Sequence, residues 1–234
     1  MNTKIEFEEH EPKEFRLFHY TPKFEFLCDM LEKGLWPRYC EEDFEWLIGE
    51  RVTLSFPMLC FCDIPLDAAN THRGRYGNYA IGFSKNWLND LDINPVWYVQ
   101  PGNSIAKNLG SNLRMEPRFS LEKLEGHPLR NALAFIKPTV AFQNDRTAGR
   151  DGTLEVFQAD EEMEWRHTPS ALSEKWFQFA ERGMTNNDHH DLSINHRMKL
   201  EFDQIECVRV LRKEEAVKLE DRFAMLKGKI LIWP

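Results

Sequence analysis

The stretch LSFPMLCFCDI, residues 54–64, is an apolar run of the length of a β-strand. Proline cannot donate a hydrogen bond within a sheet, so Pro57 indicates an edge strand or a bulge at that point. Before this run, the aromatic-rich sequence FRLFHY at residues 15–20 predicts another strand. Apolar residues then recur with helical spacing over residues 24–31, and Gly34 is expected to end that helix. A strand–helix unit therefore leads into residues 54–64.

Short strands and helices alternate irregularly along the rest of the chain. The hydrophobic pattern predicts strands at residues 79–83, 95–99, 136–140, 154–157, 163–166, 202–211 and 230–232. It predicts helices at residues 66–73, 105–135, 171–182 and 214–223, and a short helix or loop at 38–50. This order lacks the steady strand–helix rhythm of a parallel sheet, so it favours an α+β fold with a mixed or antiparallel sheet split by short helices. We expect one domain over residues 15–234, preceded by a polar arm at residues 1–14.

The composition limits the classes of function. Hydrophobic residues make up 42% of the chain and charged residues 29%, as in a protein that folds around a core. The net charge of −8 argues against a protein that coats DNA, because such proteins carry basic residues to neutralise phosphates. No apolar stretch approaches the roughly 20 residues of a membrane-spanning helix. The five cysteines are odd in number and scattered, so we expect free thiols in a cytoplasmic protein without membrane contact.

The acidic stretch EEMEWR, residues 161–166, is a candidate chemical centre. On a strand, alternate side chains share a face, so Glu162 and Glu164 are expected to point the same way. Two carboxylates held together in a cleft repel each other, which can raise the pKa of one of them or prepare the site for a cationic species. The alternative is an exposed acidic turn in which Arg166 is the ion partner.

Two further segments carry candidate binding residues. His19 ends the first predicted strand, where ligand-facing residues often gather, although a purely structural histidine is the alternative. The segment HRGRYGNY, residues 72–79, combines Arg75, Tyr76 and Tyr79 with two glycines and could hold a phosphate or stack on a base. An ordinary helix-to-strand turn is the alternative there. No cysteine or histidine spacing matches a zinc site, so we expect no metal.

These segments follow one another in an order that resembles the abortive phage-infection family of the AbiGi type. The shared motifs are LFHYT, GLWPRY, FPMLCFCDIPL, YGNYAIGFSKNW, NPVWYV and DEEMEWR, here at residues 17–21, 34–39, 56–66, 76–87, 94–99 and 160–166. More distantly, the same order is similar to ADP-ribosyltransferases of the His-Tyr-Glu class. The second resemblance implies an ADP-ribosyltransferase-like fold, with NAD as the cofactor.

Site residues follow from that resemblance position by position. It implies that His19, followed by Tyr20 and Thr21, binds the adenosine-side ribose, and that Tyr76, or less favourably Tyr79, stacks on nicotinamide. Phe61 stands where the class usually has a second tyrosine, and the basic turn of Arg73 and Arg75 would meet the pyrophosphate. Glu164 would bond the nicotinamide ribose and stabilise the oxocarbenium-like transition state. Glu162 would orient or deprotonate the acceptor.

Two functions from different classes follow. The first is an NAD-dependent ADP-ribosyltransferase, a toxin or effector of phage defence that modifies a protein or nucleic-acid acceptor. A nucleic-acid acceptor would need only a local basic surface, which the lysines and arginines of residues 105–150 could supply. The second is a non-catalytic antitoxin-like or regulatory protein that binds a cognate toxin or antitoxin, since AbiGi-type proteins are described as the antitoxin-like half of a pair.

Overall fold

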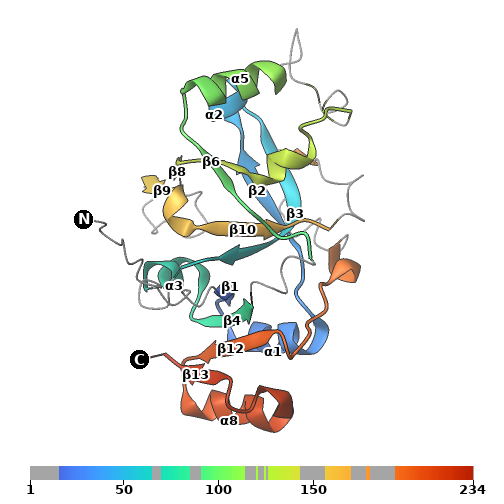
Figure 1. Cartoon of the computed structure of the whole chain (residues 1–234), viewed down its shortest axis with the longest axis vertical. Coiled ribbons are helices and arrows are strands. Elements are labelled where there is room, and N and C mark those ends of the chain that lie inside the picture. The colour runs from blue at the N-terminus through green and yellow to red at the C-terminus, as the bar shows by residue number, and fades with distance from the viewer. Residues whose placement is uncertain are drawn as a thin grey trace, which may run out of the picture.

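The fold comes from a computed structural model of the chain (Figure 1). It describes residues 16–64, 70–84, 91–113, 120, 124, 126–142, 156–169, 178–179 and 193–233. The polar arm predicted at residues 1–14 lies outside this part of the chain. The helix predicted at residues 105–135 and the strand at 154–157 lie partly outside it.

A mixed sheet of nine strands forms the centre of the molecule. Its main path runs β13-β12-β4-β1-β3-β10-β5, and β2 and β11 also pair with β3. All neighbours are antiparallel except β12 and β13, which are parallel. The strands are β1 (Arg16–Thr21), β2 (Arg38–Asp43), β3 (Thr53–Cys62), β4 (Tyr79–Ser84), β5 (Asn94–Pro95), β10 (Glu164–His167), β11 (Gln178–Phe179), β12 (Ile205–Val210) and β13 (Ile230–Ile232). The predicted α+β class with a mixed sheet is confirmed, whereas the ADP-ribosyltransferase-like arrangement stays a prediction.

β3, the strand predicted at residues 54–64, connects the two halves of the sheet. β2 pairs with it from Thr53 to Met58, and β10 pairs with it from Leu59 to Cys62. β3 as a whole has neighbours on both sides. The edge predicted at Pro57 is nevertheless present locally, because β11 reaches Ser55 and β10 begins at Leu59, so β2 is the one described strand beside Pro57.

Two hydrophobic clusters pack against opposite ends of β3. One contains Leu59 and Phe61 and is covered by α1 (Phe24–Lys33) and α8 (Lys213–Arg222), which lie at the lower end of Figure 1. The other contains the β3 residues Leu54, Phe56 and Met58 and is covered by α2 (Glu45–Ile48) and α5 (Ser104–Leu113) at the upper end. The apolar character of the whole run 54–62 follows from this double burial, because each half of the strand serves a different core.

Short elements beside the sheet position the candidate site. They are α3 (Asn70–Tyr76), the parallel pair β6 (Trp97–Val99) and β7 (Ile136–Pro138), and the antiparallel pair β8 (Val140–Phe142) and β9 (Val156–Gln158). Four 3₁₀ helices are described: η2 (Asn131–Phe135), η3 (Ala159–Glu162), η5 (Ile194–His196) and η6 (Ala224–Leu226). Of these elements, β7 carries Lys137 and η3 carries Glu162. Both side chains lie beside Glu164 of β10, the strand that pairs with the C-terminal half of β3.

Several predicted elements differ from the structure. Residues 38–43 form strand β2 instead of a helix or loop, because the neighbouring β3 offers a pairing partner that local sequence preference does not reveal. Gln178–Phe179, predicted as helical, also pairs with β3. The helix expected to end at Gly74 continues to Tyr76 and is followed by Gly77, which has a φ of +115°. Val96 separates the strand predicted at residues 95–99 into β5 and β6.

Candidate functional site

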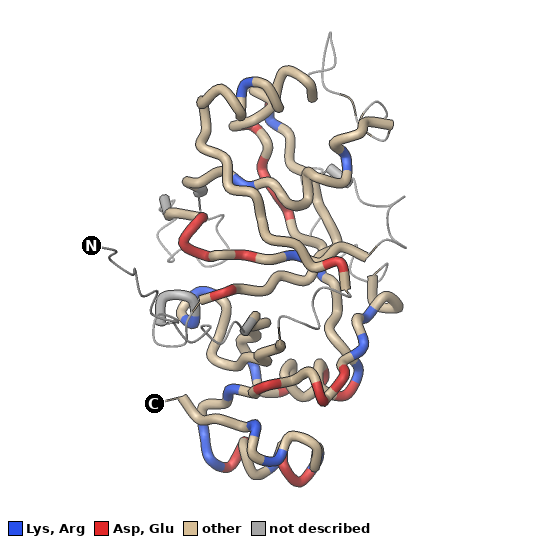
Figure 2. Tube along the Cα trace, viewed as in Figure 1, with Lys and Arg blue, Asp and Glu red and all other residues tan. Residues whose placement is uncertain are grey.

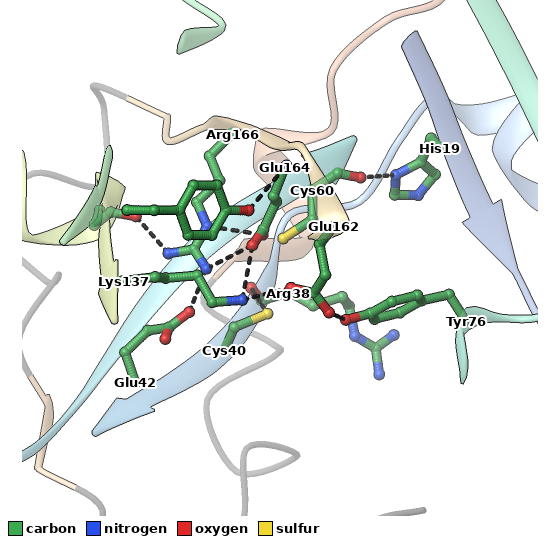
Figure 3. Close-up of polar contacts among 12 residues, drawn as sticks. His19, Arg38, Cys40, Glu42, Cys60, Tyr76, Lys137, Glu162, Glu164 and Arg166 are labelled. Carbon is green, nitrogen blue, oxygen red and sulfur yellow. Dashed lines mark hydrogen bonds and ion pairs between the residues drawn. The ribbon is translucent and has the colours of Figure 1, made fainter. Parts of the chain in front are cut away.

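One cavity of about 340 Å³ brings together six of the ten residues expected at the site (Figure 3). These six are His19, Tyr20, Phe61, Tyr76, Glu162 and Glu164, and they come from β1, β3, α3, η3 and β10. The remaining lining residues are Phe18, Cys40, Glu41, Glu42, Met58, Cys60, Lys137 and Arg166. The order of motifs along the chain thus anticipated the aromatic and carboxylate walls of the cavity, but not Lys137, Glu42 or the thiols.

Glu164 is held by two cations of its own chain. Arg166 donates from Nε to Oε1 at 2.8 Å and from Nη2 to Oε2 at 3.1 Å. Lys137 on β7 donates from Nζ to Oε2 at 2.9 Å. The backbone of Glu164 is fixed as well, because its N–H donates to the hydroxyl of Tyr98 at 3.0 Å. Glu164 is only 8% exposed, so these ion pairs are largely shielded from water.

Glu162 reaches the same lysine from a different element. It ends the 3₁₀ helix η3, and Met163 then adopts a left-handed backbone with a φ of +43° before β10 begins. The predicted reason for the convergence, alternation along one strand, is therefore wrong, although the two carboxylates do converge. Lys137 Nζ donates to Glu162 Oε2 at 2.8 Å, and the Tyr76 hydroxyl donates to Glu162 Oε1. Glu162 is 3% exposed, which excludes the exposed acidic turn.

Arg166 links the cavity to the second hydrophobic cluster. Its guanidinium, 1% exposed, also donates to the carboxylate of Glu42 on β2 and to the carbonyl oxygen of Ala134 at 2.6 Å. The cavity therefore contains three partnered carboxylates and two cations, in the arrangement shown by the dashed lines of Figure 3. The expected pairing of Arg166 with a carboxylate is present, but it is buried and involves two glutamates.

The ion pairs decide the protonation of the site. Burial alone would raise the pKa of Glu164, but the charges of Arg166 and Lys137 more than offset this and hold the pKa below its ordinary range. The expectation that repulsion raises the pKa of this carboxylate is wrong, because a cation lies between the two glutamates. Burial and the charge of Glu162 raise the pKa of the Tyr76 hydroxyl, which therefore stays protonated as a donor.

His19 is neutral and anchored to β3. Burial lowers the pKa of its imidazole, and only Nδ1–H can donate to the carbonyl oxygen of Cys60, at 2.8 Å. Nε2 is then an acceptor. The ring packs at 5.6 Å from that of Phe61, at a tilt of 55°. The histidine thus has a structural bond to β3 and an acceptor nitrogen on a ring that lines the cavity.

Thiols complete the polar wall. A hydrogen bond between Cys40 and Cys60 lowers the pKa of Cys40 and raises that of Cys60, to which burial adds. The Cys60 thiol therefore remains protonated, and it helps to lower the pKa of Glu164. The carboxylate of Glu164 thus accepts three hydrogens from charged side chains, two from Arg166 and one from Lys137.

Four expected binding residues do not line the cavity. The Tyr79 hydroxyl donates to Glu215 Oε1 on α8 at 3.0 Å, on the side of the first hydrophobic cluster. Thr21 is buried opposite Tyr79 in the β1–β4 ladder. Arg73 and Arg75 are half-buried on α3 and are absent from the cavity lining. Tyr76 is therefore the tyrosine of this helix that belongs to the site.

The basic residues expected to form one surface over residues 105–150 differ in their burial. Lys137 is a buried cation of the cavity and not a surface residue. Lys107 is exposed on α5, and Arg130 is half-buried. The remaining basic residues of this stretch, Arg114, Arg118, Lys123, Arg146 and Arg150, lie outside the described residues.

Two classes of feature were searched for in the described part of the chain. No group of three or more His, Cys, Asp and Glu side chains is arranged there to hold a metal ion. No helix there has the length and apolar character needed to cross a membrane.

The buried pair of Glu164 and Arg166 predicts a specific acid sensitivity. A carboxyl whose pKa is lowered on folding contributes stability above its unfolded pKa of 4.5, and loses it as the pH falls through and below that value. We expect the wild-type free energy of unfolding to fall more steeply than that of Glu164→Gln below pH 4.5, by up to about 1.4 kcal/mol per pH unit. Urea unfolding at several pH values measures both slopes. Equal slopes would show that Glu164 is not the group responsible.

Comparison with known proteins agrees with the ordered motifs. A model of the protein family described as "Putative abortive phage resistance protein AbiGi, antitoxin" matches residues 33–210. A curated relative from Lactococcus lactis subsp. cremoris, "Abortive phage resistance protein AbiGi", is 28% identical over 158 residues, or 59% of this chain. The match spans 63% of that relative's length, which is less than two thirds. No solved structure matches the chain. The family match covers most of the chain and confirms the resemblance, so the chain belongs to the AbiGi family of abortive phage resistance proteins.

Proposed function

We propose that this chain is a non-catalytic, antitoxin-like partner in an abortive-infection system, which binds a cognate toxin protein and keeps it inactive. The observation that carries this proposal is that both oxygens of Glu164 are already bonded to cations of its own chain. A carboxylate has about four lone-pair positions. Arg166 donates to two of them and Lys137 to a third. The family description as an antitoxin supports the same conclusion.

These ion pairs are unfavourable for transferase chemistry. A carboxylate that stabilises an oxocarbenium-like transition state must face the developing positive charge. Here Glu164 already faces two fixed cations, and one of them, Lys137, is paired with Glu162 as well. A ribose hydroxyl would have to compete with these donors for Glu164. The same ion pairs suit a structural role, because they join β2, β7 and β10 around the cavity.

Growth assays test this role. The chain, the protein encoded beside it, and both together are expressed from inducible promoters in the same host. We expect normal growth with the chain alone, arrest with its neighbour alone, and restored growth with both, together with co-purification of the two proteins. Tyr76→Phe is assayed beside the wild-type chain. This variant removes only the hydroxyl bonded to Glu162, and its side chain is 41% exposed, so it perturbs the core little. Arrest by the chain alone would refute the proposal.

A second function is supported by the composition of the cavity. NAD-dependent ADP-ribosyl transfer to a protein or nucleic acid needs an aromatic pocket with a carboxylate, and His19, Phe61, Tyr76 and Glu164 line the same cavity. The purified protein incubated with labelled NAD and cell lysate would then label an acceptor, and Glu164→Gln would not. Equal labelling by the wild type and this variant, or none by either, excludes the transferase. Thermal unfolding confirms that the variant is folded.

A further inference from the structure

A tryptophan in contact with two arginines forms a second, separate cluster of functional groups. The Arg73 guanidinium on α3 lies 4.2 Å from the centroid of the Trp233 ring, and the Arg209 guanidinium on β12 lies 5.1 Å from it. Trp233 follows β13 and is fixed by its indole N–H, which donates to the carbonyl oxygen of Asn78 at 2.6 Å. Figure 1 shows α3 and the C-terminal end of the chain on the same side of the molecule.

The positive charges of this cluster are not neutralised within the described residues. No carboxylate there forms an ion pair with Arg73 or Arg209, in contrast to Arg166 in the cavity. Arg73 donates from Nε to the side chain of Asn78 at 3.3 Å, so the N–H groups on its two Nη atoms remain to bind a ligand. The Nε of Arg209 is buried, and no group in the described part of the chain accepts a hydrogen bond from it. A buried donor without an acceptor is costly, so a bound acceptor would stabilise the cluster.

The surroundings of the cluster offer donors. Arg209 lies on the same face of β12 as Cys207, two residues earlier, and so faces the side of the sheet that carries Tyr20. Burial raises the pKa of the Tyr20 hydroxyl, and the nearby charges of Arg73 and Arg209 lower it by less. This hydroxyl therefore stays protonated. Two guanidinium forks offer several N–H donors in planar arrays, which match the oxygens of a tetrahedral oxyanion.

We propose that Arg73, Arg209 and Trp233 form a binding site for a phosphoryl group, either free or as a monoester of a small molecule. The two guanidiniums bind the oxygens, and the indole ring, whose faces attract cations, keeps both forks in position. A dianion neutralises both charges at once, which a carboxylate cannot do. This site is independent of the ion pairs around Glu164 and of the proposed antitoxin role.

A site-specific titration tests the proposal. Inorganic phosphate and glycerol phosphate are added at constant ionic strength to the full chain labelled with ¹⁵N, with sodium chloride as reference. The indole N–H signal of Trp233 is assigned by its loss in Trp233→Phe. We expect both phosphates, but not chloride, to shift this signal saturably. Equal affinities indicate recognition of the terminal dianion alone, and tighter binding of the ester indicates further contacts.

Matched variants determine which arginines bind. Arg73→Gln and Arg209→Gln are each expected to weaken phosphate binding about tenfold or more, because each removes a charge-assisted hydrogen bond. Arg209→Lys keeps the charge without the planar fork and is expected to recover part of the affinity. Arg222→Gln on α8, which removes an exposed arginine, is the control and should bind as the wild type. Equal shifts of all indole signals, or unchanged affinity in the correctly folded Arg73 and Arg209 variants, would overturn the proposal.

Discussion

Replacement of Arg166 by methionine is expected to lower the free energy of unfolding by about 3–5 kcal/mol. Arg166 is 1% exposed, and its guanidinium is bonded to Glu164, Glu42 and the carbonyl oxygen of Ala134. Methionine approximates the aliphatic stem but removes every donor. Glu42 then loses its ion partner, and Glu164 retains only Lys137 among the cations, so a buried carboxylate becomes partly uncompensated.

Urea unfolding measures this loss against two comparisons. Arg222→Met removes an exposed ion pair with Glu32 and should cost at most about 1 kcal/mol. The double variant Glu164→Gln/Arg166→Met should be less unstable than the sum of the two single variants, because the partners share one interaction. Additive effects, or a loss for Arg166→Met no larger than for Arg222→Met, would mean that the buried ion pairs do not hold the cavity together.

The sequence allowed the walls of the cavity to be predicted, but not their electrostatics. His19, Tyr76 and the glutamates could be found because each belongs to a short motif whose position relative to a strand or helix is local information. Lys137 could not, because nothing in the run IKP distinguishes it from a solvated lysine, and it meets its carboxylates only through the pairing of β6 with β7. Glu42 was hidden for a similar reason, since it lies 124 residues from Arg166 on a strand that local preference did not indicate.

Lys137 and Glu42, which the sequence did not indicate, change the chemistry expected of the two predicted glutamates. Two converging carboxylates without cations would form a site for a positively charged group. The same carboxylates are each paired with Lys137, and the pKa of Glu164 is lowered instead of raised. Figure 2 shows that red acidic positions lead into β10 and are followed on that strand by a blue basic position. A carboxylate pair identified from sequence alone therefore gives the location of a site more securely than its reactivity.

The close packing of the α3–β4 turn against the end of β1 determines whether Tyr76 reaches Glu162, and Gly77 makes this packing possible. At its φ of +115°, a side chain would be strained, and an added Cβ would lie 2.3 Å from the carbonyl oxygen of Thr21 and 2.4 Å from Cα of Pro22. Both are backbone atoms, at the last residue of β1 and the residue after it, so they cannot rotate away. We expect Gly77→Ala to lower the free energy of unfolding by about 3 kcal/mol, through backbone strain and the separation of α3 from β1.

Gly74, three residues earlier and within α3, provides a matched control. A Cβ at this position would meet no atom within 4 Å, and alanine favours a helix over glycine. Gly74→Ala should therefore leave stability unchanged or raise it by about 0.5–1 kcal/mol. Because Tyr76 lies between the two glycines, Gly77→Ala should also weaken its bond to Glu162, and a subsequent Tyr76→Phe change should cost less than in the wild type. Equal stability of the two alanine variants would show that α3 can be displaced from β1 without cost, and that the position of Tyr76 at the cavity does not depend on Gly77.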